Sequence, residues 1–115
     1  MAKASLAHRA LPKPAAKAIE TLVHGLAIAR KRRRIPQRLL ANRMMVSLDT
    51  LQRLERGDPG VSLAVLATAL WALGLVERLA AVASPDQDTV GNAEELKRLP
   101  RQARIPKAAK STLDF

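Results

Sequence analysis

The sequence of 115 residues contains no cysteine and very few aromatic residues: one Trp, one Phe and no Tyr. Without cysteine the chain has no disulfide, no thiolate nucleophile and no Cys-based zinc site. Proteins that bind RNA or single strands stack bases on aromatic side chains, so this scarcity argues against that class. No apolar run reaches the roughly 18 residues of a membrane span, and the first residues lack the apolar core of a signal peptide. We therefore expect a cytoplasmic protein outside the membrane.

The residues that build common enzyme sites are also missing. The only imidazoles are His8, in the N-terminal segment, and His24, on the flank of an expected helix. For His24 a surface position is favoured over a role as a ligand or base. We find no Gly-rich phosphate loop, no carboxylate pair with a base and no cluster with metal-ligand spacing. We expect no enzymatic activity, no cofactor and no metal.

Positive charge is abundant. The sequence has 20 Lys and Arg against 10 Asp and Glu, a formal net charge of +10. This balance suits a polyanionic partner, either nucleic acid or an anionic membrane surface. The length allows one domain of ordinary size.

Apolar residues recur at helical spacing through the middle of the chain, and alternating β-branched runs are absent. We predict an all-α domain over residues 15–84. A flexible basic N-terminal arm, 1–14, precedes it. This arm is either a disordered terminus or a segment that contacts DNA phosphates or a minor groove. A basic, largely disordered tail, 85–115, follows, with at most a weak helix over 93–99. The five predicted helices span 15–33, 36–43, 47–56, 62–73 and 76–83.

The segment 36–57 has the layout of a helix-turn-helix: two short helices joined by a turn at 44–46, the second with a polar outer face. Ser47 is expected to cap the second helix, because its hydroxyl can accept from a backbone N–H two or three residues on. Gly57 suits the end of that helix, since glycine accepts φ > 0 without strain, and Asp58-Pro59-Gly60 predicts a turn.

On the second helix of this motif, the i, i+3 spacing places two apolar side chains toward the core and leaves four others outward. The inward pair is Leu51 and Leu54, and the outward side chains are Leu48, Asp49, Gln52 and Arg53.

Residues 22–75 resemble the XRE family of lambda-repressor-like DNA-binding domains. Within the family, ERGDPGVSL and ALWALGL are most similar to HipB-like antitoxins or regulators, which are often paired with a HipA-type kinase. The chain departs from the family at Met45, where glycine is usual. Either the turn avoids positive φ at this position or Met45 bears strain. The matching positions are Gln37, Leu40, Ala41, Val46, Ser47, Thr50, Leu51, Arg53, Leu54, Glu55, Gly57, Ser62, Leu63 and Leu66.

The resemblance implies that Gln37 contacts a backbone phosphate and braces the second helix, and that Thr50 contacts phosphate. Ser47, at the start of that helix, belongs to the same set of expected DNA-binding residues. It also places the four outward residues at base-facing positions. Arg53 suits guanine and Gln52 suits adenine, although both also fit ordinary solvated positions. Leu48 has only an apolar contact to offer, most plausibly with a thymine methyl. For Asp49 we favour an interaction with the helix N-terminus over base recognition.

The resemblance further implies an ion pair between Arg30 and Glu55 that bridges the first and third helices. Arg32 and Arg33, in the basic run 30–34, are either phosphate contacts or a solvated helix end that compensates the dipole.

Three apolar residues are candidates for a dimer or partner surface: Trp71, Leu79 and Val82. For Trp71, at the edge of an apolar stripe, the favoured alternative is a partly buried core position; a lone Trp also suits a partner surface.

Three functional hypotheses remain. The first is a sequence-specific DNA-binding repressor, acting as a homodimer on a palindromic operator. The second, compatible with it, is an antitoxin that inhibits a HipA-type kinase and represses its own operon, with DNA binding either primary or secondary. The third is a nonspecific basic binder of nucleic acid or membrane surfaces, which predicts no preference among DNA sequences.

Overall fold

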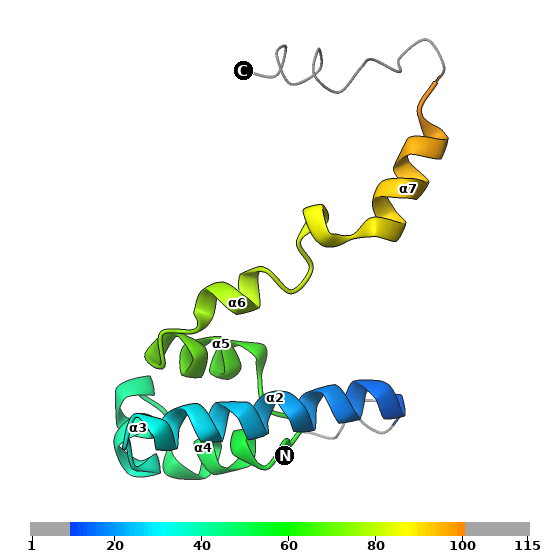
Figure 1. Cartoon of the computed structure of the whole chain (residues 1–115). Helices are drawn as coiled ribbons and strands as arrows, with labels where there is room; N and C mark the ends of the chain where they lie inside the picture. Colours follow the sequence, from blue (N-terminus) through cyan, green and yellow to red (C-terminus); the bar gives the residue numbers. More distant parts are fainter. Residues whose placement is uncertain (1–9, 101–115) are drawn as a thin grey trace. The chain divides into compact units, whose positions relative to one another are not determined.

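The computed structural model describes residues 10–100, and all regular secondary structure in this range is helical, as the periodicity predicted for residues 15–84. The chain divides into two compact units, one ending at Leu79 and the other beginning at Ala80. The described elements are α2 (Lys13–Arg32), α3 (Gln37–Met44), α4 (Leu48–Glu55), α5 (Leu63–Ala72), α6 (Val76–Ala80), the 3-10 helix η1 (Pro85–Gln87) and α7 (Thr89–Arg98) (Figure 1).

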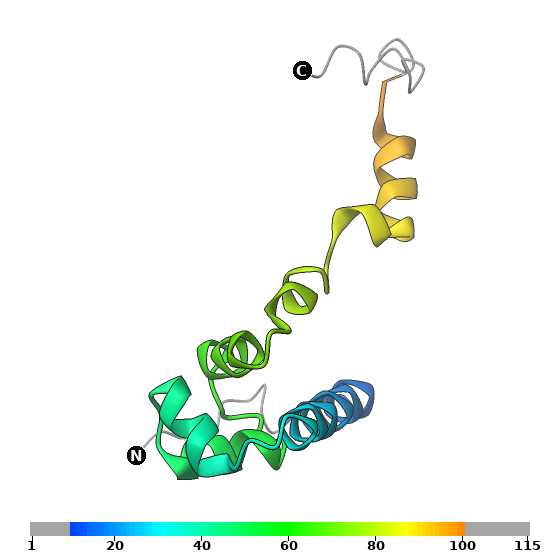
Figure 2. The same ribbon diagram turned by 60° about the vertical axis from the view of Figure 1, so that its left-hand side comes forward.

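The first unit is organised around the pair α3 and α4, which follow the long helix α2. Helix α3 packs against both α4 and α5, and α2 packs against α4 (Figure 2). Among residues 10–100, no helix has the length and apolar character needed to cross a membrane.

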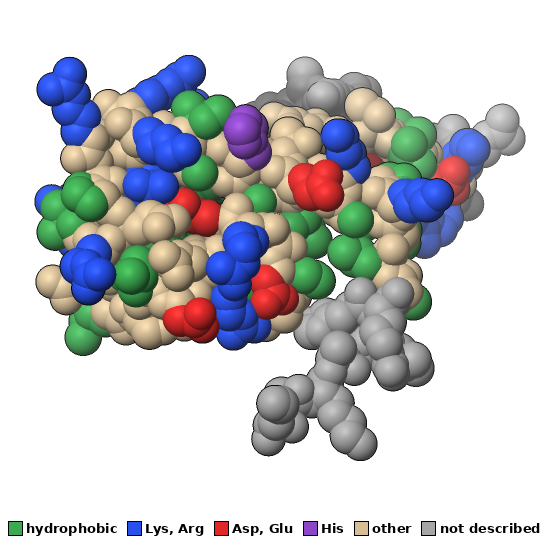
Figure 3. Space-filling model, turned by 90° about the horizontal axis from the view of Figure 1, so that it is seen from below, with side chains coloured by type: hydrophobic (Ala, Val, Ile, Leu, Met, Phe, Trp, Pro, Cys, Tyr) green, Lys and Arg blue, Asp and Glu red, His purple; other side chains and the backbone are tan. Residues whose placement is uncertain are grey.

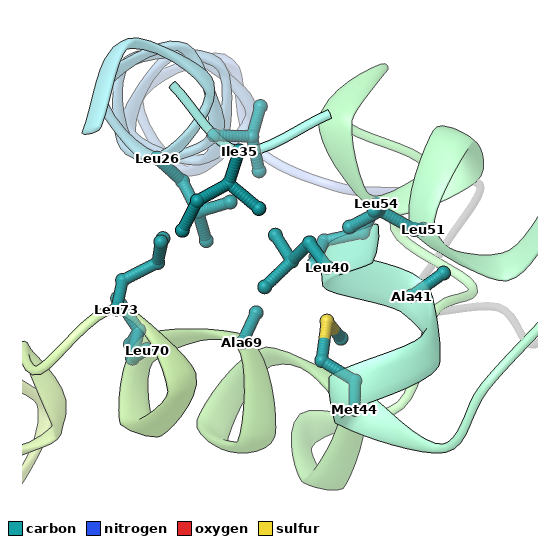
Figure 4. Close-up of a cluster of buried hydrophobic side chains, with 11 residues drawn as sticks. Leu26, Ile35, Leu40, Ala41, Met44, Leu51, Leu54, Ala69, Leu70 and Leu73 are labelled. Atoms are coloured by element: carbon teal, nitrogen blue, oxygen red, sulfur yellow. The ribbon is translucent and has the colours of Figure 1, made fainter. Parts of the chain in front are cut away.

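The core of this unit is made by apolar side chains from four helices (Figure 4). Leu26 of α2, Leu40 of α3 and Leu51 of α4 are the largest side chains that are almost completely buried. Each contributes roughly 1.5–3 kcal/mol through the apolar surface it removes from water. Leu51 and Leu54 anchor α4 in the core, so the inward face of α4 is the one that the i, i+3 spacing predicted.

Four helices of this unit end in the same hydrogen-bonded turn. In each, a residue with positive φ follows the helix, and the next backbone N–H donates to a carbonyl five residues earlier. Gly57 and Gly74 occupy the positive-φ position after α4 and α5, with φ of 82° and 76°. Arg34 and Met45 occupy it after α2 and α3, with φ of 54° and 58°. A left-handed conformation costs a non-glycine residue roughly 1–2 kcal/mol, so two of the four turns are strained.

Met45 therefore bears the strain that was one of the two alternatives left open by the sequence. Its N–H donates to the carbonyl of Asn42, and the N–H of Val46 donates to that of Ala41, both at 3.0 Å. Its side chain is 91% exposed, so no packing contact offsets the backbone cost.

Replacing Met45 by Gly is expected to raise the free energy of unfolding by about 1 kcal/mol, because glycine adopts φ near 58° without a clash. Thermal unfolding would show this as a higher midpoint, by roughly 4–8 °C. Arg43→Gly is the matched control: Arg43 is exposed and helical on the same helix, so glycine there should destabilise by roughly 0.5–1 kcal/mol. A Met45→Gly variant less stable than the parent would contradict the assignment of strain.

The predicted boundaries of the first four helices are within two residues of those observed, whereas the fifth is shorter than predicted. Helix α6 ends at Ala80 instead of residue 83. Pro36 had been placed inside its helix but precedes α3 as an extended N-cap.

The prediction of an irregular chain from residue 85 is wrong for 85–92, where η1 and the first turn of α7 form; the rest of α7 overlaps the weak helix allowed over 93–99. Asp88 is the reason that α7 begins where it does, because its Oδ1 accepts from the N–H of Gly91 at 2.9 Å. Most of the predicted N-terminal arm, 1–9, and the end of the predicted tail, 101–115, lie outside the described residues.

Candidate nucleic-acid interface

Helix α4 begins at the predicted cap. Ser47 is extended, and its Oγ accepts from the N–H of Thr50 at 3.1 Å. The Ser47 and Thr50 hydroxyl oxygens also lie 2.9 Å apart, within hydrogen-bond distance. Asp49 is exposed in the first turn, where a carboxylate interacts favourably with the helix dipole. The N-terminus of α4 is therefore capped by Ser47, and the outer face of the helix remains accessible to solvent at Asp49.

Leu48, which was predicted to point outward, is partly exposed. Its side chain lines an open groove of about 600 Å³ between α3 and the start of α4. The other residues lining this groove are Pro36, Arg38, Leu39, Ala41, Asn42 and Val46.

The ion pair expected between Arg30 and Glu55 is present and joins α2 to α4. Arg30 Nε donates to Glu55 Oε2 at 2.7 Å, and Nη2 donates to Oε1 at 3.1 Å. A third donor, Nη1, reaches the carbonyl of Ile35 at 3.0 Å. The two charged side chains are only 9% and 7% exposed. The pair is therefore buried, bidentate and satisfied.

Gln37 adds α3 to this arrangement. Its Nε2 donates to Glu55 Oε1 at 2.8 Å, and its Oε1 accepts from Gln52 Nε2 at 3.4 Å. Glu55 is thus the point at which side chains from α2, α3 and α4 meet. Through Gln37, the same network reaches Gln52 on the outer half of α4.

Arg53 is neither free nor buried. Its Nε donates to Oδ2 of Asp58 at 2.9 Å, and the two side chains are 40% and 36% exposed. Asp58 Oδ1 accepts from the N–H of Gly60 at 2.8 Å. Sequence reasoning interpreted Asp58 only as part of a turn. The signal that could have identified the contact is the spacing of five residues between Arg53 and Asp58, because these residues lie on either side of the end of α4.

The N–H of Gly60, and then the guanidinium of Arg53, hold the pKa of Asp58 below its ordinary value. A lowered pKa means that the ionised carboxylate is favoured in the folded protein, so this contribution to stability is present above the ordinary pKa and is lost as the pH falls through the lowered one. At neutral pH Asp58 is ionised and paired.

Exposed basic residues surround α3 and α4. The run at the end of α2 includes Arg32 and Arg33, both exposed. Arg33 Nη1 donates to the carbonyl of Ala29 at 2.8 Å, so part of its guanidinium serves the helix C-terminus, as one alternative for this run expected. Acidic side chains lie beside basic ones on the face shown in Figure 3. Other exposed arginines on or beside helices α3 and α4 are Arg34, Arg38, Arg43 and Arg56.

The three apolar candidates for a partner surface differ in their surroundings. Trp71 is 63% exposed, so the favoured interpretation of a partly buried core residue is wrong. Leu79 is partly buried and packs against the core of the first unit. Val82 is exposed and belongs to the second unit.

The α3–α4 region offers hydrogen-bond donors and positive charge among the described residues. Among residues 10–100, no group of His, Asp and Glu side chains is arranged to hold a metal ion, and His24 is exposed. What the α3–α4 region offers is a helix anchored on one side, with polar side chains held in place on the other. No family model, no curated protein and no solved structure matches this chain.

Proposed function

We propose that the protein is a sequence-specific DNA-binding regulator whose helix α4 enters the major groove. The observation that carries this proposal is the outer face of α4. Gln52 and Arg53 are side chains suited to base edges. Gln37 holds Gln52 and Asp58 holds Arg53 by hydrogen bonds. The helix that carries both residues is anchored in the core by Leu51 and Leu54. Base recognition requires such fixed donors, because a misplaced side chain makes no bidentate contact.

The fold proposed for this role is the five-helix lambda-repressor-like arrangement, formed by α2 to α6. Its support is the order of the helices and the short connection between α3 and α4. Gln37 would contact a phosphate at the start of α3 while bracing Glu55 and Gln52. Thr50 would contact phosphate from the first turn of α4.

A homodimer on a palindromic operator is part of the proposal. One recognition helix contacts too few base pairs for useful genomic specificity, and two half-sites would lie about 10–10.5 bp apart, or a multiple of that. Trp71, exposed on α5, is the strongest candidate for a contact with a second copy or another protein. A role as a cytoplasmic HipB-like antitoxin, with a HipA-type kinase as partner, rests on the resemblance of the sequence alone.

The competing function is nonspecific binding of nucleic acid. The exposed arginines around α3 and α4 favour it, because phosphate contacts alone give binding without sequence preference.

Selection from a random duplex library, followed by affinity measurements at one physiological salt concentration, separates the two functions. A specific regulator should bind the enriched duplex roughly 10³- to 10⁷-fold more tightly than a scrambled duplex, with two protomers per palindromic site. Equal affinities for both duplexes would reject the proposed function and favour the nonspecific binder.

The phosphate contribution has its own prediction. Replacing Arg32 and Arg33 by Ala should weaken binding to enriched and scrambled duplexes alike. It should also flatten the dependence of log K on log salt, by about 0.9 for each phosphate that the protein no longer neutralises.

Lys13→Ala with Lys17→Ala is the matched control, because it removes two exposed charges from the other end of α2. At about 1.5 Å per residue, Lys13 and Arg32 are roughly 28 Å apart, well beyond the Debye length of about 8 Å at physiological salt. Equal effects from both double variants would mean that net charge, not contact by the arginines, is responsible.

A further inference from the structure

Asp58 is bound through both carboxylate oxygens, and each bond has a different function. The bond from Oδ1 to the N–H of Gly60 fixes the carboxylate within its own turn. The bond from Oδ2 to Nε fixes the guanidinium of Arg53. The backbone joins the same two residues, since the N–H of Asp58 donates to the carbonyl of Arg53 at 3.1 Å. Arg53 is therefore held by a structured turn, and not by a freely moving acidic side chain.

The pairing uses only one of the donor nitrogens of Arg53. Within residues 10–100, Nη1 and Nη2 of Arg53 donate to no other group, so the outer end of the guanidinium remains available. A guanidinium presents its N–H groups as a planar fork that matches O6 and N7 of guanine. An unrestrained arginine loses considerable rotamer freedom when it binds, whereas one that is already ordered loses less.

The negative charge beside Arg53 also affects which contacts it favours. A carboxylate close to the guanidinium repels a DNA phosphate, while guanine O6 and N7 carry no net charge. The pairing therefore weakens phosphate contact by Arg53 more than base contact. Asp58 carries this negative charge at neutral pH, and the N–H of Gly60 and the guanidinium of Arg53 lower its pKa below its ordinary value.

We propose that Asp58 is a positioning residue that determines specificity: it orients the guanidinium of Arg53 toward a guanine edge and disfavours its contact with phosphate. This inference rests on the proposed function, and it adds a residue that does not itself touch a base.

Asp58→Asn tests the inference with little disturbance of the turn. The asparagine Oδ1 still accepts from the N–H of Gly60, but its Nδ2 is a donor and cannot accept from Arg53 Nε. On the enriched duplex and its single-base variants, the parent should prefer guanine at one position per half-site by about 5- to 150-fold. Asp58→Asn should reduce that preference by about 2- to 10-fold, the effect of ordering one side chain. Affinity for scrambled DNA should stay equal or rise.

Two further variants show whether the effect passes through Arg53. Glu20→Gln removes an exposed carboxylate from α2 that has no ion pair within the described residues, so it should leave the guanine preference unchanged. In an Arg53→Ala background, Asp58→Asn should produce no further change in base preference. Denaturant unfolding of each variant identifies losses that come from stability alone.

The outcomes distinguish this inference from the proposed function. If Arg53→Ala abolishes the guanine preference and Asp58→Asn leaves it intact, Asp58 serves only the turn, and the inference fails while DNA recognition by α4 stands. If Glu20→Gln relaxes the same preference equally, the cause is charge and not positioning, and the inference also fails. A parent protein that does not distinguish the enriched from the scrambled duplex overturns both.

Discussion

Replacing Glu55 by Ala is expected to lower the free energy of unfolding by about 3–5 kcal/mol, the cost of leaving a buried charge without its partner. Arg30 is the charge left behind. It is almost fully buried, and two of its donors point at the Glu55 carboxylate. Its third donor is held by the carbonyl of Ile35, so the guanidinium has little freedom to turn toward water. Gln37 also loses an acceptor in the variant.

Urea unfolding followed by circular dichroism measures this effect, which is large compared with the roughly 5–15 kcal/mol that stabilises a typical domain. Glu20→Ala is the control, because it removes an exposed carboxylate from α2 and should change stability by at most about 0.5 kcal/mol. Replacing Arg30 by Met together with Glu55 by Leu should recover most of the loss, since it leaves no uncompensated charge. A Glu55→Ala variant within about 1 kcal/mol of the parent would show that the pair contributes little and that Arg30 finds other partners.

Leu51→Ala is expected to destabilise the first unit by about 2–5 kcal/mol, through reduced burial and the cavity that remains. Leu51 is completely buried, and with Leu54 it is one of only two buried residues on α4. Its truncation therefore loosens the helix that we propose enters the major groove. DNA affinity should fall for every sequence, because the variant weakens the placement of the helix and leaves its outer side chains unchanged.

Unfolding and DNA binding are best measured on the same preparations of this variant. Leu63→Ala is the matched control, since Leu63 is an exposed leucine at the start of α5 and should change stability by at most about 0.5 kcal/mol. A similar loss of stability from Leu51→Ala and Leu63→Ala would mean that Leu51 is not more deeply buried in the core than Leu63. A Leu51→Ala variant that keeps full DNA affinity and loses only base preference would contradict its role as an anchor.

Helices α2 to α5 were predictable because their features are local in the sequence. Helical periodicity selects the buried face of α4, and Ser47 caps the residues that directly follow it. The hydrogen-bond pattern of a helix end likewise depends on a few consecutive residues. Such features appear in the sequence before any contact with distant segments is known.

The remaining features depend on contacts between segments. Helix α5 carries apolar residues around most of its surface, so periodicity alone gave no way to know that Trp71 faces solvent. The pairing of Arg53 with Asp58 requires a particular path of the chain after Gly57. The start of helix α7 was not predicted, because its cap, Asp88, belongs to a residue type that also favours turns.

The meeting of three helices at Glu55 also affects how the first unit unfolds. Detaching α2 removes Arg30, and detaching α3 removes Gln37, so each partial opening leaves Glu55 short of partners in a poorly hydrated place. Forms in which only two of the helices are docked therefore lack contacts to Glu55 that the native unit has. We therefore expect this polar contact, together with the apolar core, to make α2, α3 and α4 open together, which native-state hydrogen exchange would show as similar opening free energies for their amides.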